Sequence, residues 1–253
     1  MDNGYADMAS RHTLHYMPNE FDANTNYELP TIPPGGGYLA SVRLGDGKNP
    51  GNNSEGISYS YKVQAGTAGV LKIKYAIVLE DPKHNIKDQP HFWLDVLQQG
   101  GRRIPNDCGL AKFSAGDGSG WREGIKGWVY RPWDEHAINL RDYEGQTLTI
   151  RLVTTDCGLE GHTGYVYFVL DCESGEMSGL NCGEDNPTTH FSAPGGFDYV
   201  WYRQDNPTDT LSTKQTFDIQ PLDTNVYNVN LINKKNANCW YTLTVSGLPR
   251  IPT

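Results

Sequence analysis

Long hydrophobic runs are missing from this sequence of 253 residues. Its apolar stretches, of which Tyr75 to Leu79 is an example, last only a few residues, and the mean hydropathy is −0.58. A membrane-spanning helix needs about 20 consecutive apolar residues, so no transmembrane segment is predicted. Positive charge is also scarce, because 21 Lys and Arg stand against 30 Asp and Glu and no segment concentrates the cations. Binding to a phosphate backbone requires clustered positive charge, and we therefore expect no nucleic-acid partner.

The motifs of several enzyme classes are missing as well. The sequence contains no GxSxG elbow, no HExxH zinc-protease motif and no GxxxxGK[ST] phosphate loop. It has no CxxC pair, so a structural zinc site of the zinc-finger type is not expected. A glycosidase needs two carboxylates facing each other across a cleft, and the 30 acids of the chain neither identify nor exclude such a pair. The sequence therefore predicts a protein without catalytic activity, and a glycan-active hydrolase is the least favoured alternative.

What the sequence does contain is typical of strands and turns. It has 28 Gly, 15 Pro and 15 Tyr, whereas long helices favour Ala, Glu, Lys and Leu. Apolar and polar residues alternate from Ile57 to Gln64, which is the pattern of a strand with one face in water. Similar segments, separated by turn-rich stretches, predict an all-β protein with strands over 57–64, 70–79, 92–97, 127–130, 137–140, 146–153, 164–170, 197–203, 215–219, 226–232 and 239–245.

The turn-rich and polar stretches also predict how the chain is divided into domains. Residues 1–37 are polar and are expected to form an irregular leader that lies across a later sheet. Residues 38–172 hold the first group of strands, and the small and acidic residues of 173–179 are typical of a linker. The strands predicted within 180–253 suit a small antiparallel sandwich. Trp201 lies between Cys182 and Cys239, the order in which an immunoglobulin-type core places its tryptophan beside a disulfide.

Five cysteines lie at positions 108, 157, 172, 182 and 239. Five buried, reduced thiols would suit a cytosolic protein, whereas the composition rich in Tyr, Asn, Thr and Gly favours an exported one. Residues Met1 to Tyr5 do not resemble a signal peptide, and export is nevertheless our expectation. For the exported chain we predict a disulfide between Cys182 and Cys239. Among the other three cysteines, a bridge between Cys157 and Cys172 is favoured over a bridge from Cys108, and one thiol stays free.

Several motifs, taken in order along the chain, carry a resemblance to a known group of proteins. They are Ala40–Gly45, Tyr75–His84, Gln89–Phe92, Trp133, Ile138–Leu140, Tyr143–Gln146, Thr155–Tyr167 and Ala193–Tyr202. Together they resemble modules of secreted, multidomain surface proteins of Bacteroidetes, over most of residues 38–246. The resemblance implies a jelly-roll-type β-sandwich at 38–172 and a smaller Ig-like or PKD-like sandwich at 180–253. It also implies an extracellular or outer-membrane surface location and an adhesin-like role.

Two predicted loops combine histidines with carboxylates. Asp81 and His84 follow one strand, and Asp156 and His162 follow another. We expect the loops to meet at one end of the sandwich. We also expect His84 or His162 to hydrogen-bond an acidic side chain or a backbone carbonyl of a neighbouring loop, because an unpartnered buried donor costs about 1–3 kcal/mol. A structural role is the favoured interpretation, and a metal or acid–base site is the alternative. A structural calcium ion is a further candidate cofactor. Calcium prefers oxygen ligands, and these are offered by Asp46, Asn52, Asn53, Glu55 and Asp171.

Aromatic side chains offer a second kind of candidate site. Sugar sites use flat aromatic faces flanked by hydrogen-bonding side chains. Tryptophan is also an ordinary core residue of β-sandwiches, and the candidate sugar platform consists of Trp93, Trp121 and Trp133 with Arg122 and Arg131. We therefore predict a non-catalytic extracellular module for adhesion or ligand display, with a glycan or a host surface ligand as its partner. A carbohydrate-binding module for glycan capture is the alternative.

Overall fold

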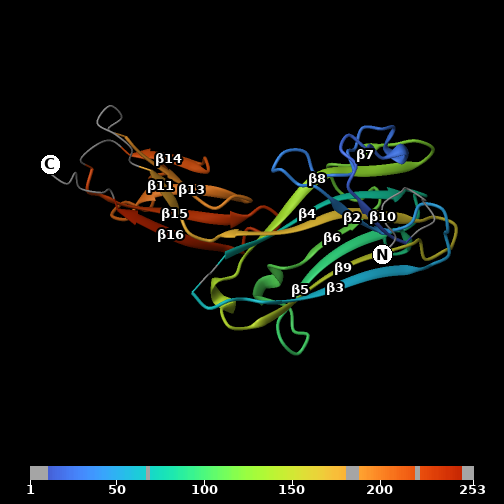
Figure 1. Cartoon of the computed structure of the whole chain (residues 1–253), viewed down its shortest axis with the longest axis horizontal. Helices are drawn as coiled ribbons and strands as arrows, with labels where there is room; N and C mark the ends of the chain where they lie inside the picture. Colours follow the sequence, from blue (N-terminus) through green and yellow to red (C-terminus); the bar gives the residue numbers. More distant parts are fainter. Residues whose placement is uncertain (1–10, 67–68, 181–187, 220–222, 247–253) are drawn as a thin grey trace.

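The computed structural model describes residues 11–66, 69–180, 188–219 and 223–246. Within these ranges the strands form four antiparallel sheets, arranged as two adjoining sandwiches (Figure 1). Short 3-10 helices lie in the connections at Ala23–Thr25 (η1), Ile86–Asp88 (η2), Pro105–Asp107 (η3) and Arg141–Tyr143 (η4). No helix among the described residues is long and apolar enough to cross a membrane. The predicted all-β class is confirmed.

The larger sandwich is a jelly roll. From edge to edge, one sheet contains β1 (His12–His15), β2 (Ser41–Gly45), β10 (Gly164–Ser174), β4 (Gly69–Glu80), β8 (Trp128–Asn139) and β7 (Arg122–Glu123). The facing sheet contains β3 (Ser54–Lys62), β9 (Thr147–Thr155), β5 (His91–Leu97) and β6 (Ala111–Ser114). The chain passes repeatedly between the sheets, since β2, β4, β8 and β10 belong to the first and β3, β5, β6 and β9 to the second. Eight antiparallel strands wound in this way form the double-sheet jelly roll that the resemblance implied.

Alternation along the strands builds the core between the two sheets. On β9, Leu148, Ile150 and Leu152 are buried in that core, at every second position. On β4, by contrast, both faces are buried from Tyr75 onward. Its Ala76 belongs to a second apolar cluster on the outer face of the sheet. The six-stranded sheet is therefore covered on both sides, as a nearly continuous apolar strand indicates.

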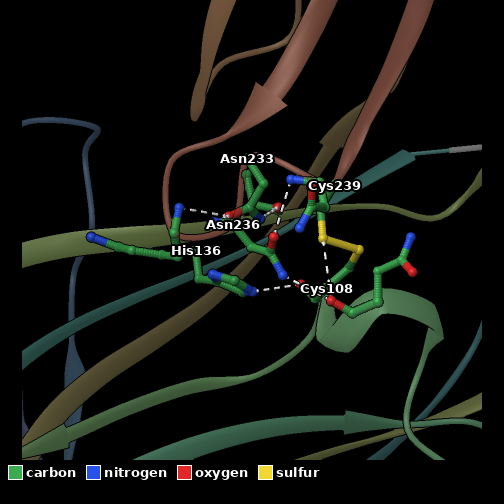
Figure 2. The surroundings of a disulfide bond; sticks show 9 residues. Cys108, His136, Asn233, Asn236 and Cys239 are labelled. Carbon is green, nitrogen blue, oxygen red and sulfur yellow. Dashed lines mark hydrogen bonds between the residues drawn. A yellow bond between two sulfur atoms is a disulfide. The ribbon is translucent and has the colours of Figure 1, made fainter.

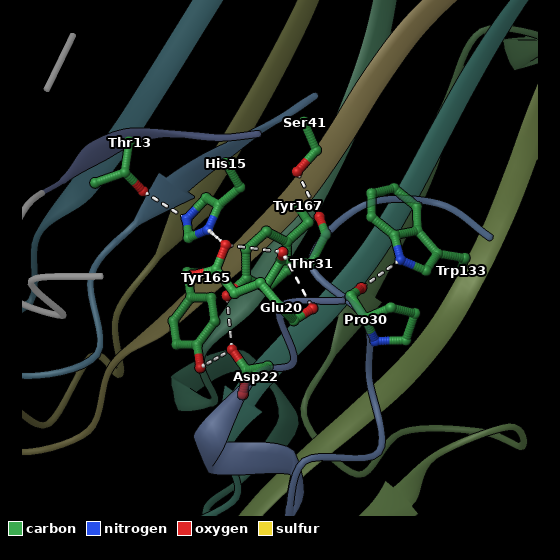
Figure 3. A network of polar contacts seen from close by, with 10 residues as sticks. All are labelled: Thr13, His15, Glu20, Asp22, Pro30, Thr31, Ser41, Trp133, Tyr165 and Tyr167. Atoms are coloured by element: carbon green, nitrogen blue, oxygen red, sulfur yellow. Dashed lines mark hydrogen bonds and ion pairs between the residues drawn. The ribbon is translucent and has the colours of Figure 1, made fainter. Parts of the chain in front are cut away.

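The N-terminal segment (residues 11–37) covers part of that outer face (Figure 3). After β1 has paired with β2, the segment presents Asp22, whose carboxylate accepts hydrogen bonds from the hydroxyls of Tyr165 at 2.8 Å and Tyr167 at 2.7 Å. The indole N–H of Trp133 donates to the Pro30 carbonyl at 2.7 Å. Burial raises the pKa of Asp22, although the hydrogen bonds from Tyr167 and Tyr165 oppose the shift. The described part of the predicted leader therefore crosses the outer face of a later sheet, and it begins with the strand β1 and is not irregular throughout.

The smaller sandwich has three strands in each sheet. The strands β11 (Ser178–Leu180), β12 (Thr189–Ser192) and β14 (Thr216–Ile219) form one sheet, and β13 (Phe197–Arg203), β15 (Val226–Asn233) and β16 (Trp240–Ser246) form the other. This order resembles that of immunoglobulin-like sandwiches, whose third strand carries the buried tryptophan. Trp201 on β13 has no exposed surface, and its indole N–H donates to the Lys214 carbonyl at 2.8 Å. Since β10 continues to Ser174 and β11 begins at Ser178, the connection between the sandwiches is shorter than the predicted linker.

The smaller sandwich is docked on the six-stranded sheet. Val70 on β4 and Ala137 on β8 are buried in the same cluster as Phe197 on β13. The side-chain amide of Asn233 donates to the Ala137 carbonyl at 2.8 Å. The two sandwiches therefore share an apolar contact whose edge is hydrogen-bonded.

A disulfide joins the two sandwiches at this contact (Figure 2). It links Cys108, directly after η3, to Cys239, directly before β16. Close by, the side-chain amide of Asn236 donates to the Asn106 carbonyl at 2.8 Å. The predicted bridge between Cys182 and Cys239 is therefore wrong, because the turn that carries Cys239 lies against the jelly roll and finds its partner there. Cys182 lies outside the described residues.

The predicted bridge between Cys157 and Cys172 is also wrong, since both thiols are free. Cys157 lies beside the start of β10, where its N–H donates to the His162 carbonyl at 3.0 Å. Cys172 lies toward the other end of the same strand, eight residues beyond Gly164. At about 3.3 Å per residue these ends are about 26 Å apart, whereas a disulfide requires Cα atoms within about 7 Å.

Candidate functional site

The outer face of the four-stranded sheet is left open. Neither of the two further apolar clusters found in the described part of the chain includes a residue of this sheet. The N-terminal segment lies instead on the opposite side of the jelly roll, and the smaller sandwich adjoins one of its ends (Figure 1). A sheet face without a covering layer is available to a ligand.

The strand register places Trp93 within this face. Because Phe92 and Leu94 point into the core, Trp93 and the residues level with it point outward. One row across the sheet consists of Gly56, Val153, Trp93 and Lys112, and the next consists of Ser58, Arg151 and Asp95. The members of these rows on β3, Gly56 and Ser58, are small and exposed. They therefore leave space beside Trp93 for a ligand.

Trp93 carries its own stacking partner. The ring of His91 lies on it with centroids 5.4 Å apart and an interplanar angle of 19°. The Nδ1 atom of His91 lies 3.1 Å from the Gln89 carbonyl, which makes Nδ1 the donor. Burial lowers the pKa of His91, although the hydrogen bond to Gln89 opposes it. The imidazole is therefore mainly neutral at pH 7, and a half-buried aromatic pair lies on the open face.

An arginine-bound carboxylate lies directly beside this aromatic pair. The side chain of Asp95 is 1% exposed, and its Oδ2 accepts from Arg151 Nη2 at 3.0 Å and from Arg103 Nε at 3.4 Å. The two arginine side chains are 42% and 51% exposed. Asp95 thus holds two half-exposed guanidinium groups at the surface, although Arg151 Nε is itself buried and has no partner among the described residues. Arg103 Nη1 also lies 3.7 Å from Asp107. With Lys112, the face therefore has three cations near two carboxylates.

These features together suit a sugar ring. An aromatic face stacks on the apolar side of a pyranose, and fixed N–H donors bind its hydroxyls or a carboxylate. Because Asp95 holds the arginines in place, fewer side-chain rotamers have to be frozen when a ligand binds. This arrangement can bind a polyol surface.

The other members of the predicted platform lie elsewhere. Trp121 and Arg131 are together, since the guanidinium lies 5.5 Å from the Trp121 ring centroid. The Trp121 indole N–H donates to the Asp117 carbonyl at 2.8 Å, and Arg122 follows on the short strand β7. Trp133 packs beneath the N-terminal segment. The structure therefore does not bring the three tryptophans to one surface, and only Trp93 lies on the open sheet face.

Two cavities lie outside this face. One, of about 340 Å³, opens where the edge strand β3 meets the other sheet and is lined by Tyr59, Tyr61, Leu71, Ile150, Leu170, Asp171 and Cys172. The other, of about 180 Å³, lies beside the disulfide between the sandwiches, and Asp142 is its one acidic lining residue. Neither of these two cavities has the two carboxylates that glycoside hydrolysis requires.

The two histidine loops do meet at one end of the jelly roll. The rings of His84 and His162 lie 5.3 Å apart at an interplanar angle of 84°. His84 Nδ1 lies 3.7 Å from Cys157 Sγ, so its partner among the described residues is a thiol and not the predicted acidic side chain or backbone carbonyl. Asp81 has a separate role, because it accepts hydrogen bonds from Gln89 Nε2 at 2.7 Å and from the Lys83 backbone N–H at 3.1 Å. Burial opposes ionisation of Asp81, but these bonds lower its pKa.

The proposed calcium ligands are only partly gathered. Arg11 Nη1 lies 3.0 Å from Glu55, and Arg11 Nε lies 3.9 Å from Asp46. Burial, and next the charge of Asp156, raise the pKa of Glu55 to about 7. Asp156 accepts from the Asn53 N–H at 3.3 Å. Asp171 does not join this group, since it accepts from the Tyr38 hydroxyl. A calcium site remains a prediction.

Sequence reasoning missed the residues that complete both sites. Arg103 and Arg151 come from a turn and from another strand, so their approach to Asp95 depends on strand pairing that no local motif reveals. Alternation along β9 could have identified Arg151 as a surface residue of the sheet, because it lies between Ile150 and Leu152, which point into the core. Cys157 was assigned to a bridge, although its place one residue after Asp156 put it in the loop that was expected to meet His84.

Comparisons with known proteins add little to this geometry. No protein-family model matches the chain, and no curated protein sequence matches it. Solved structures that it resembles include the Spr0440 glycoside hydrolase domain of Endo-D from Streptococcus pneumoniae R6, with 10% identity, a TM-score of 0.31, and coverage of 82% of this chain and 33% of that one. This chain therefore spans about a third of that domain.

Two carbohydrate-binding modules are also similar in structure. TmCBM61 in complex with β-1,4-galactotriose has 14% identity and a TM-score of 0.34, and covers 64% of this chain and 83% of that one. CBM27-1 of Caldicellulosiruptor saccharolyticus in complex with mannohexaose has 12% identity and a TM-score of 0.31, with 66% and 87% covered. Such low scores leave the fold assignment to the strand order described above, and they assign no ligand to this chain.

Proposed function

We propose that this protein is a non-catalytic, extracellular module that binds glycans through the open face of its four-stranded sheet. The observation that carries the proposal is the stacked Trp93–His91 pair beside the arginines held by Asp95. A disulfide supports an extracellular setting, because such bonds persist in oxidising compartments. The excess of cations on the face favours glycans that carry carboxylates over neutral ones.

A second function, that of a rigid display or adhesion module, is favoured by a different observation. The two sandwiches share an apolar cluster, and the Cys108–Cys239 disulfide fixes them to each other. Such a contact resists the relative motion that is usual between domains. In this alternative the module holds another part of a surface protein at a set distance, and the open face needs no ligand.

Binding by the purified chain to an array of oligosaccharides separates the two functions. The array includes β-1,4-linked galactose and mannose oligomers and uronic-acid polymers, each tested with and without calcium. Titration calorimetry on the best ligand then compares the chain with Trp93→Ala. Loss of the stacking surface is expected to weaken binding at least about tenfold, or 1.4 kcal/mol.

Tyr59→Ala is the matched control for this experiment. Tyr59 is a 55% exposed aromatic on the edge strand of the same sheet, but it lies level with Ile150 and so faces the other side. The Tyr59→Ala variant should bind the glycan with unchanged affinity. Absence of any glycan binding, or equal weakening by both substitutions, contradicts the proposed function.

A further inference from the structure

Three metal-ligating side chains converge where the two histidine loops meet. Each of His84, Cys157 and His162 offers one ligand atom, and these atoms all lie within 4.8 Å of one another. His84 is held on the loop that follows β4, and the other two lie on the loop between β9 and β10. The N–H of Cys157 donates to the His162 carbonyl at 3.0 Å, which fixes the two ends of the second loop together.

The spacing fits direct coordination of one ion. Zinc binds cysteine sulfur at about 2.3 Å and histidine nitrogen at about 2.0–2.1 Å. Two such ligands in a tetrahedral arrangement lie about 3.6 Å apart by these bond lengths. The Cys157 Sγ to His84 Nδ1 distance is 3.7 Å, so this pair is already placed as it would be around an ion.

The surroundings of the cluster point to a missing partner. Nδ1 of His162 is buried and has no hydrogen-bond partner among the described residues. Cys157 is fully buried yet free, in a protein that elsewhere forms a disulfide. Burial also keeps substrates from the thiol, which argues against a nucleophilic Cys–His pair. An ion bound by thiolate and imidazole would explain why two rings gather around this sulfur.

We propose that His84, Cys157 and His162 bind a transition-metal ion of the zinc class. One thiolate and two imidazoles form a donor set that zinc prefers, whereas calcium and magnesium prefer oxygen. Three protein ligands leave a fourth position for water or another donor. The ion would join the loop after β4 to the loop before β10, and would therefore stabilise this end of the jelly roll. The proposal does not depend on glycan binding.

Titration of the metal-free full-length chain with Co²⁺ tests the proposal. The disulfide is kept intact by omitting thiol reductants. One equivalent of Co²⁺ is expected to produce a near-ultraviolet thiolate-to-cobalt band, and Zn²⁺ should displace it. At a hundredfold excess over Kd, Zn²⁺ should raise Tm by about 5–10 °C.

The chain supplies a matched control, because Cys172 is the other free cysteine and is exposed. Cys172→Ser should retain the band and the Tm shift, and Cys157→Ser should lose both. If circular dichroism shows that Cys157→Ser is unfolded, His84→Gln and His162→Gln replace it, and each should weaken Co²⁺ binding by at least tenfold. The proposal is overturned if no thiolate band forms, if the band survives Cys157→Ser, or if Cys172→Ser removes it.

Discussion

The two outer faces of the jelly roll are built by the same alternation of residues, but one face is covered by other segments of the chain and the other is open. On the six-stranded sheet, the outward aromatics Tyr165 and Tyr167 bond to Asp22 beneath the N-terminal segment, and the smaller sandwich covers the far end. On the four-stranded sheet, outward Trp93 stacks with His91, and neither further apolar cluster of the described residues covers this face. The difference teaches that an outward aromatic residue indicates a binding surface only where no other segment of the chain covers it.

The largest expected effect comes from releasing the smaller sandwich. Cys108→Ser combined with Cys239→Ser opens a crosslink spanning 131 residues. The chain-entropy model for a loop of this length predicts a stability loss of about 5 kcal/mol. Urea unfolding followed by circular dichroism measures it. Glycan binding at the open face should be unchanged, and a joint loss of both properties would contradict the separation of the two faces.

Removal of the carboxylate beneath the N-terminal segment comes next. Asp22→Ala leaves the buried hydroxyls of Tyr165 and Tyr167 without their acceptor, and should lower the free energy of unfolding by about 3 kcal/mol. Asp171→Ala is the control, because it removes the same kind of bond between half-buried Tyr38 and the exposed Asp171. Its cost should stay below about 0.5 kcal/mol. Equal costs would show that the segment is not a true covering layer.

The contact between the sandwiches should also respond to pH. His136 is 1% exposed, and its Nε2–H donates to the Cys108 carbonyl at 2.8 Å (Figure 2). Burial lowers the pKa of His136 to about 4 from the usual 6.5. Neutral His136 therefore contributes stability that is complete above pH 6.5 and is lost as the pH falls toward 4, up to about 3 kcal/mol.

Denaturant titrations between pH 4 and 7 measure this effect by difference. In His136→Gln the part of the pH dependence that belongs to this residue disappears, whereas other buried histidines such as His15 keep theirs. A variant with the same slope as the parent chain would place the pH dependence elsewhere.

The smallest effect compares one tryptophan from each face. Trp133→Phe removes the hydrogen bond to the Pro30 carbonyl and should cost about 1 kcal/mol. Trp93→Phe removes no hydrogen bond within the described residues and should change stability by less than about 0.5 kcal/mol. Thermal unfolding of the two variants tests this, and the reverse order of costs would contradict the assignment of the faces.

The sequence predicted the strands well, because alternation is a local property. Leu148, Ile150 and Leu152 at every second position identify β9 without any knowledge of its neighbours. Alternation along β5 also puts Trp93 on the same side as His91 and Asp95, which is the open face. The sequence also predicted that the His84 and His162 loops meet, because the strands that precede them contribute to the same core.

What the sequence did not reveal depends on docking between distant segments. The partner of Cys239 is 131 residues away, on another sandwich, and no spacing rule encodes how two sandwiches pack. Trp93 and Trp133 were both candidates for the sugar platform, and the path of the N-terminal segment places Trp133 beneath it. Arg103 reaches Asp95 from a turn whose direction is set by the pairing of β5 with its neighbours.

The indole N–H resonances of Trp93 and Trp133 test the central claim most directly. In a nitrogen-15 labelled chain these two signals report on the open and the covered face at once. Titration with the glycan identified on the array should shift the Trp93 signal in proportion to saturation and leave the Trp133 signal in place. A shift of the Trp133 signal with a constant Trp93 signal would contradict the account.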